Sequence, residues 1–387
     1  MAAALILMLT PLGASDHADP IDLFNRKPLE GGITDLFFFP RTDENGVKRM
    51  EVILCVRRAL TQAGSLMLEP YTYTIYMDLI SAVAFDNDEQ LKRYGGTVPE
   101  AIKESVTIPI RLTNEAKLKE RPTFKGLIGD PTRITIQTGV FDDPFIFPTF
   151  FGTNVVGMVL SIPLDAFPSS QHDWILWATS SRDGKQVDHV GRSLRTQNPR
   201  FDMLNTLHPS QHIAAIKAER AHPSLMRDIF LKLNFQQVFA FRDWDEVPDV
   251  MIYSDRRPVG FPNGRLLTDD VAELLARYGD TLLKEISHIT GKWSPDDATH
   301  KDGRATANDM PFLCVSPNCD QTIPENLAFP YLADPWPEKK PKPPPMLTET
   351  NRTKLWLIGL AFVVLVIVEN WIVAKWYHRK QLRRRFL

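Results

Sequence analysis

Residues 71–80 read YTYTIYMDLI, a run of β-branched and aromatic residues that is typical of a β-strand. Similar short stretches, each bounded by turn residues, occur on both sides of it in the first half of the chain. They are residues 33–40, 50–59, 105–112, 133–140, 157–164 and 174–181. The pattern predicts antiparallel sheets that form a sandwich or a barrel.

The second half of the chain carries helical patterns. Residues 208–221 begin with a His-Pro-Ser start signal, and a second candidate covers residues 223–235. A third candidate, residues 267–289, has Thr268 as its N-cap and two aspartates in its first turn. We therefore predict an α+β fold that is rich in β-structure, with a helical segment late in the domain.

The chain ends in a proline-rich stretch, an apolar run and a basic tail. Residues 330–349 favour an extended polyproline conformation that acts as a spacer. Twenty residues between Lys354 and Lys375 are almost all apolar, which is the length that a membrane-spanning helix needs. We expect five segments, namely a signal-like segment at 1–15, an exported domain at 16–329, a stalk at 330–353, a transmembrane helix at 354–375 and a cytoplasmic tail at 376–387.

The orientation of this span depends on the N-terminus. Six basic residues flank the span on its C-terminal side and five on the other, so the positive-inside rule does not decide. Residues 1–15, MAAALILMLTPLGAS, resemble a secretory signal that is cleaved after Ala14 or Ser15, although no basic residue precedes the apolar run. Retention as a strand, or a start further upstream, are the alternatives. A cleaved signal places the large domain in the periplasm and the anchor in the inner membrane.

Three cysteines are consistent with export. Cys314 and Cys319 flank a Ser-Pro-Asn turn, which favours a disulfide over two unlinked thiols. Cys55 lies in an apolar strand and is expected to be a buried thiol.

Known catalytic motifs do not occur in the sequence. It contains no Gly-x-Ser-x-Gly elbow, phosphate loop, dinucleotide fingerprint or His-Glu-x-x-His motif, so we assign no catalytic residue. The formal net charge is −2, and the only basic patch is the tail, which argues against a nucleic-acid partner. His208, His212 and His222 are interpreted as surface or core residues.

Several motifs occur in an order that resembles the bacterial domain-of-unknown-function family 4331. They are SDHADP (15–20), TDLFFFP (34–40), TGVFDDPFIFPTFF (138–151), GMVLSIPLDAF (157–167), WATSS (177–181) and GFPNGRLLTDDVAELL (260–275). The resemblance covers roughly residues 15–290 and is most specific at residues 261–271. It implies an exported domain and no particular chemistry, because the family has no established activity. Phe141 departs from the basic residue that the family usually has there.

The sequence identifies no cofactor, and a divalent cation is the one candidate that it offers. His17, Asp35, Asp142 and Asp143 are candidate ligands, because hard cations bind several carboxylate oxygens. The alternative is that Asp142 and Asp143 form a turn and bind the local backbone. If cleavage follows Ala14, a terminal amine and His17 could chelate copper or nickel.

Glu369 and Asn370 interrupt the apolar run. Either the span ends near Val368 and both lie at the interface, or Glu369 faces a partner helix to which Asn370 adds a hydrogen bond. We favour a membrane-anchored, non-catalytic accessory or structural subunit that docks on a larger membrane complex, such as an electron-transfer assembly. The alternative is a metal-dependent enzyme or ligand-binding protein at the outer face of the membrane.

Overall fold

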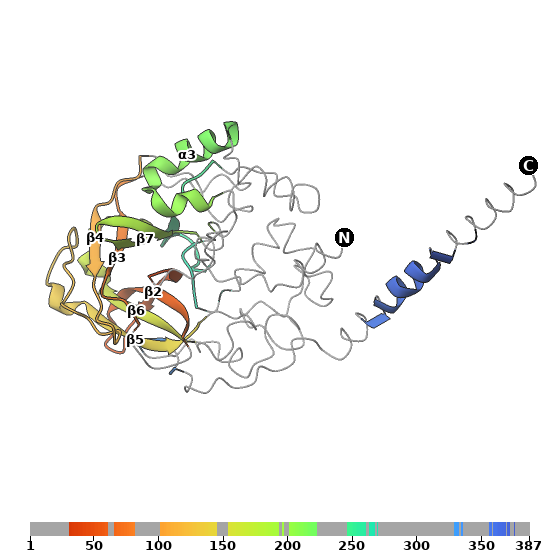
Figure 1. Cartoon of the computed structure of the whole chain (residues 1–387). Helices are drawn as coiled ribbons and strands as arrows, with labels where there is room; N and C mark the ends of the chain where they lie inside the picture. The colour runs from red at the N-terminus through yellow and green to blue at the C-terminus, as the bar shows by residue number, and fades with distance from the viewer. Residues whose placement is uncertain are drawn as a thin grey trace, which may run out of the picture.

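A computed structural model describes most of the predicted β-rich domain and part of the C-terminal helix (Figure 1). The described residues are 31–60, 66–81, 101–144, 154–192, 196, 201–222, 246–260, 263–267, 269, 329–332, 334–335, 356–357, 359–368, 370–371 and 375. Within them the chain forms two antiparallel sheets and few helices, so the predicted β-rich class is confirmed.

The first sheet, sheet A, has the strand order β1-β2-β6-β5. Its strands are β1 (Ile33–Thr42), β2 (Lys48–Leu60), β6 (Asn154–Pro163) and β5 (Thr135–Asp142). All three pairings are antiparallel. Strands β1 and β5 are therefore the two edges of this sheet.

The second sheet, sheet B, has the order β4-β3-β7-β8. Its strands are β4 (Val106–Ile110), β3 (Tyr71–Asp78), β7 (Asp173–Arg182) and β8 (Lys185–Val190). A short strand, β9 (Met251–Ser254), pairs with the first part of β7, while β8 pairs with its last part. Strands β8 and β9 were not predicted from the sequence.

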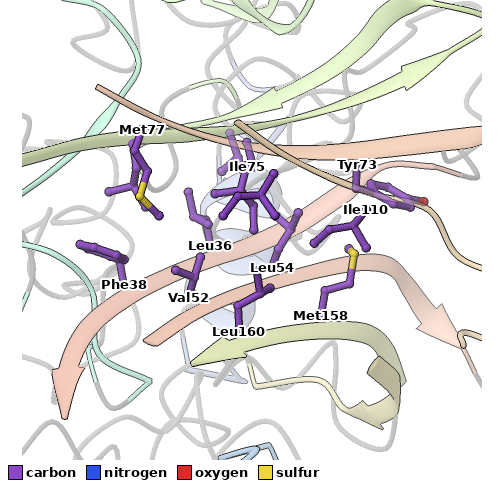
Figure 2. Packing of buried hydrophobic residues seen from close by; sticks show 14 of the residues in the cluster. Leu36, Phe38, Val52, Leu54, Tyr73, Ile75, Met77, Ile110, Met158 and Leu160 are labelled. Atoms are coloured by element: carbon purple, nitrogen blue, oxygen red, sulfur yellow. The ribbon is translucent and has the colours of Figure 1, made fainter. Parts of the chain in front are cut away.

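The main core lies between the two sheets. Figure 2 shows Leu36, Val52, Leu54 and Leu160 of sheet A facing Ile75 and neighbouring side chains of sheet B. Successive residues of a strand point to opposite faces, so even-numbered residues of β2 enter this core while Ile53 lies on the other face.

The outer faces of both sheets are also covered. On sheet A, Phe37, Phe39 and Ile53 pack beneath Tyr331 and Leu332. On sheet B, Ile102, Ile175, Trp177, Val250 and Ile252 form a separate cluster. Burial on two faces explains why several strands are continuous apolar runs, such as β6, whose ten residues are all buried.

Residues 263–265 join strand β9 to strand β1. The Asn263 side chain accepts a hydrogen bond from the Ser254 amide (2.7 Å) and donates one to the Ser254 carbonyl (2.9 Å). Gly264 has φ +74°, and a Cβ there would lie 2.6 Å from the Phe38 carbonyl oxygen. Arg265 then exchanges two backbone hydrogen bonds with Phe38. This part of the most specific motif therefore has a structural role.

The described helices are short apart from α3 (Pro209–Ala221). Pro209 opens the first turn of α3, as the sequence predicted, and His208 caps the helix by accepting a hydrogen bond from the Ser210 amide. The 3-10 helices are η1 (Pro131–Arg133), η3 (Leu164–Ala166) and η4 (Asp202–Thr206). The predicted helix at 223–235, and nearly all of the one at 267–289, fall outside the described residues.

Candidate functional site

A C-terminal strap, residues 329–332, crosses the outer face of sheet A. Tyr331 and Leu332 are only 5% and 6% exposed, although they lie at the start of the predicted stalk. The Tyr331 ring packs edge-on against Phe39 and Phe329, with both centroid distances 5.8 Å. The Arg41 guanidinium lies 5.1 Å from the same ring centroid. The strap therefore holds the first residues of the proline-rich stretch against sheet A.

A buried carboxyl group interacts with this strap. Glu51 of β2 is fully buried, and the Ser161 hydroxyl donates a hydrogen bond to its Oε1 (2.8 Å). Arg49 Nε in turn donates to the Ser161 hydroxyl oxygen (2.6 Å). Burial raises the pKa of Glu51, and the hydrogen bonds from Ser161 and Tyr331 and the charges of Arg49 and Arg41 oppose this rise.

The Tyr331 phenol of the strap also has a raised pKa. Burial, followed by the neighbouring charge of Glu51, raises the pKa of Tyr331, so the phenol stays protonated. A carboxyl with a raised pKa is common in active sites, but structural networks show it too. Because Glu51 has no exposed surface, we interpret this network as structural. It holds the strap against sheet A.

Asp35 forms a buried charge pair with Arg265 on the same face. Its Oδ1 lies 3.6 Å from Arg265 NH1, and both side chains are at most 2% exposed. The Arg265 guanidinium also lies 4.1 Å from the Phe37 ring centroid. Removing one partner of such a pair leaves an uncompensated buried charge, so loss of either side chain alone should destabilise the fold.

Three of the four predicted cation ligands have described backbone positions, and Asp35 lies apart from the other two. Asp35 is on edge strand β1, whereas Asp142 ends the opposite edge strand β5 and Asp143 is buried just after it. Three strand spacings separate these edges, which is about 14 Å, whereas calcium ligands lie about 2.4 Å from their ion. Sheet A therefore does not bring Asp35 and Asp142 together. His17 and the Asp142 side chain lie outside the described residues.

Two buried histidines join sheet B to the residues around α3. The Asp249 amide donates to His212 Nδ1 (3.0 Å), and His212 Nε2 lies 3.0 Å from the Leu207 carbonyl oxygen. His212 is therefore neutral, with its proton on Nε2. His189 Nε2 lies 2.8 Å from the Asp249 carbonyl oxygen and 3.3 Å from Asp249 Oδ2. The rings of His189 and His212 pack edge-on, with their centroids 5.0 Å apart.

These contacts give the histidines a structural role. Both nitrogens of His212 bind backbone groups, so the ring crosslinks α3 to the segment that leads into β9. His208 lies at the surface, 3.2 Å from Glu104 Oε2, and His222 is exposed. Among the described residues, no three His, Cys, Asp or Glu side chains are grouped to hold a metal ion.

The C-terminal helix, blue in Figure 1, exposes apolar side chains all round. Trp356 is 72% exposed, Phe362 65% and Trp371 60%. The Asn370 amide donates to the Val366 carbonyl oxygen of the preceding turn (2.8 Å). Within the described part of the chain, no helix combines the length and apolar character that a membrane crossing requires. Residues 358, 369 and 372–374 lie outside that part, so nothing is assigned to the Glu369 side chain.

One of the three cysteines lies within the described residues. Cys55 is a fully buried thiol on the outer face of sheet A, as predicted. Cys314 and Cys319 lie outside the described residues, so their disulfide stays a prediction.

Sequence reasoning missed Glu51, Arg265 and the pair His189–Asp249. Glu51 is a charged residue within an apolar strand, and this was the one signal that the sequence offered for it. A charged residue in such a strand either lies on an exposed face or is buried with polar partners. The other pairings join residues far apart in sequence and carry no local pattern. Comparisons with protein-family models, curated proteins and solved structures found no match, so the resemblance to family 4331 remains a prediction.

Proposed function

We propose that the protein is a membrane-anchored, non-catalytic accessory subunit whose β-rich domain docks on a larger membrane protein complex. The observation that carries this proposal is the exposed apolar helix. Of the fourteen exposed large apolar side chains among the described residues, eleven lie between positions 356 and 371. A helix that is apolar on every side is typical of a large protein core or of a membrane.

The order of segments supports the same function. The strap fixes the end of the domain to sheet A, and the proline-rich stretch that follows is suited to act as a spacer. In this proposal residues 354–375 cross the inner membrane, the domain lies in the periplasm and the basic tail lies in the cytoplasm. The signal-like segment at 1–15 directs export.

Glu369 and Asn370 mark the docking face of the helix in this proposal. A carboxylate within a span costs about 2.5–3.5 kcal/mol at the bilayer centre, so it requires a partner. Lys375 is the basic residue nearest to Glu369 in the sequence. It is six positions away and does not share a helix face with Glu369. A side-chain amide has both donor and acceptor groups, so Asn370 can keep its bond to Val366 and still accept one from a neighbouring helix.

Substitution of Glu369 by leucine tests this docking. A hydrogen bond to a charged group contributes about 1.5–3 kcal/mol, so we expect Glu369→Leu to weaken recovery with the complex by about 10- to 100-fold. The variant should still insert into membranes, because leucine is more apolar than glutamate. Val363→Leu, in the same helix, is the control and should leave the recovery of partner chains in mild detergent unchanged. Equal yields of partner chains for Glu369→Leu and the unmodified chain would show that Glu369 lies at the interface instead.

A further inference from the structure

The strap is seated on sheet A at a position where strand β6 has no side chain. A Cβ on Gly157 would lie 2.7 Å from Leu332 Cδ1 and 2.7 Å from Phe141 Cδ2, which is closer than real Cβ contacts come. Gly157 pairs with Cys55 of β2, and Cys55 belongs to the same buried cluster as Leu332. The strap therefore packs over the Cys55 thiol through contacts that the glycine permits.

The carboxyl group beneath the strap is bound by hydroxyl groups. Glu51 is fully buried and accepts hydrogen bonds from Ser161 of β6 and from Tyr331 of the strap. Arg49 of β2 and Arg41 of β1 act on it through their charge. The Arg49 guanidinium donates to the Ser161 hydroxyl and carbonyl oxygens, and that of Arg41 lies over the Tyr331 ring. Among the described residues, the hydrogen-bond donors to the carboxyl are therefore two neutral hydroxyls.

This environment favours the neutral form of the Glu51 carboxyl. Burial is the largest influence and raises its pKa, while the two hydroxyl bonds and the two arginine charges oppose the rise. Tyr331 is 5% exposed and lies against this carboxyl, so the strap contributes to the burial. The closed strap then binds the Glu51 proton more tightly than an open strap does. By linkage, loss of that proton weakens the packing of the strap by the same factor.

We propose that the strap is a pH-sensitive latch, which is closed on sheet A while Glu51 carries a proton and opens when the carboxyl ionises. Closure is complete below the pH at which an exposed glutamate titrates, and it is lost as the pH rises through the range in which the buried carboxyl titrates. An ionised Glu51 under a closed strap would lack the hydration that water gives it when the strap is open.

Opening of the latch changes the tether of the domain. The strap leads directly into the proline-rich stretch, so its four residues, 329–332, would add about 13 Å of extended chain to the spacer. This consequence rests on the proposed function. The latch itself depends only on contacts within sheet A and the strap, so it does not require residues 354–375 to cross a membrane.

The test uses Cys55 as a reporter in the full chain in mild detergent. Dithiodipyridine, which reacts with thiols in acid and neutral solution, is added at a series of pH values that begins below 4.5, the ordinary value for Glu51. Peptide mass mapping separates labelling of Cys55 from that of Cys314 and Cys319. The Cys55 rate, divided by the rate in Glu51→Gln, should be near one below this pH. Above it, the ratio should rise by up to tenfold per pH unit, because one proton is coupled to opening.

Two variants serve as controls. Glu44→Gln removes an exposed carboxyl from the turn between β1 and β2 and should label like the unmodified chain at every pH. Tyr331→Ala weakens the closed strap and should label Cys55 faster than the unmodified chain at every pH. The far-UV circular dichroism of the unmodified chain should stay constant over the same series, because only the strap opens.

Four results would overturn the latch. They are a ratio that does not change with pH, an effect of Glu44→Gln equal to that of Glu51→Gln, an unchanged Cys55 rate in Tyr331→Ala, and a loss of circular dichroism that accompanies the labelling. The labelling does not report on the membrane helix. A failure of the Glu369 experiment with an intact pH response of Cys55 would therefore reject the membrane docking and keep the latch.

Discussion

Tyr331→Ala tests whether the strap is part of the folded domain. The Tyr331 side chain is 5% exposed and contacts Phe39, Phe329 and Arg41. Loss of about 120 Å² of buried ring surface at about 25 cal/mol/Å² costs about 3 kcal/mol in the free energy of unfolding. Since domains are stable by about 5–15 kcal/mol, the variant should be clearly weakened but folded.

Pulse proteolysis of the full chain in urea measures this loss. With a urea dependence of about 3 kcal/mol/M, Tyr331→Ala should lower the unfolding midpoint by about 1 M. Tyr331→Phe keeps the ring and should cost about 1 kcal/mol for the lost hydroxyl. Ile80→Ala is the exposed control, because Ile80 is 85% exposed. If Tyr331→Ala unfolds at the same urea concentration as Ile80→Ala, the strap does not contribute to the stability of the domain.

Two further predictions concern buried groups of sheet A and the segment beside it. Burial raises the pKa of Glu51 above its ordinary value of 4.5, so the folded state holds the proton more tightly and loses stability as pH rises through the folded pKa. Glu51→Gln should therefore gain stability relative to the unmodified chain as the pH is raised above 4.5, and urea midpoints that change in parallel would contradict this reasoning. Gly264→Ala should cost at least about 2 kcal/mol, because it combines a left-handed backbone with the contact to Phe38, whereas Gly46→Ala (φ +76°, nothing within 4 Å) should cost about 1 kcal/mol. Equal urea midpoints for the two glycine variants would exclude the close approach to Phe38.

The strands that were predicted from sequence share one physical property. All seven, β1 to β7, carry apolar residues on at least one face, and the strap and the residues around β9 cover the outer sides of the two sheets. Their composition therefore indicates strands without knowledge of the pairing. Strands β8 and β9 were missed because β8 carries Asp188 and His189, which are buried with polar partners, and β9 has only four residues.

The pairing of the buried charged residues could not be predicted from local sequence patterns. Asp35 was assigned to a cation site because hard cations bind several carboxylate oxygens. In the structure its partner is Arg265, which the turn at Asn263 and Gly264 positions beside β1. Long-range pairs of this kind depend on the arrangement of strands, which local patterns do not specify.

Extraction of membranes at alkaline pH tests the central claim, which is the membrane anchor. Cells that express the full chain, and cells that express a chain ending at Leu347, are lysed, and their membranes are washed with sodium carbonate. The full chain should stay in the membrane pellet, because a run of twenty residues that are almost all apolar cannot leave the bilayer without being exposed to water. The chain ending at Leu347 should be released into the supernatant. Release of the full chain by carbonate would contradict the account.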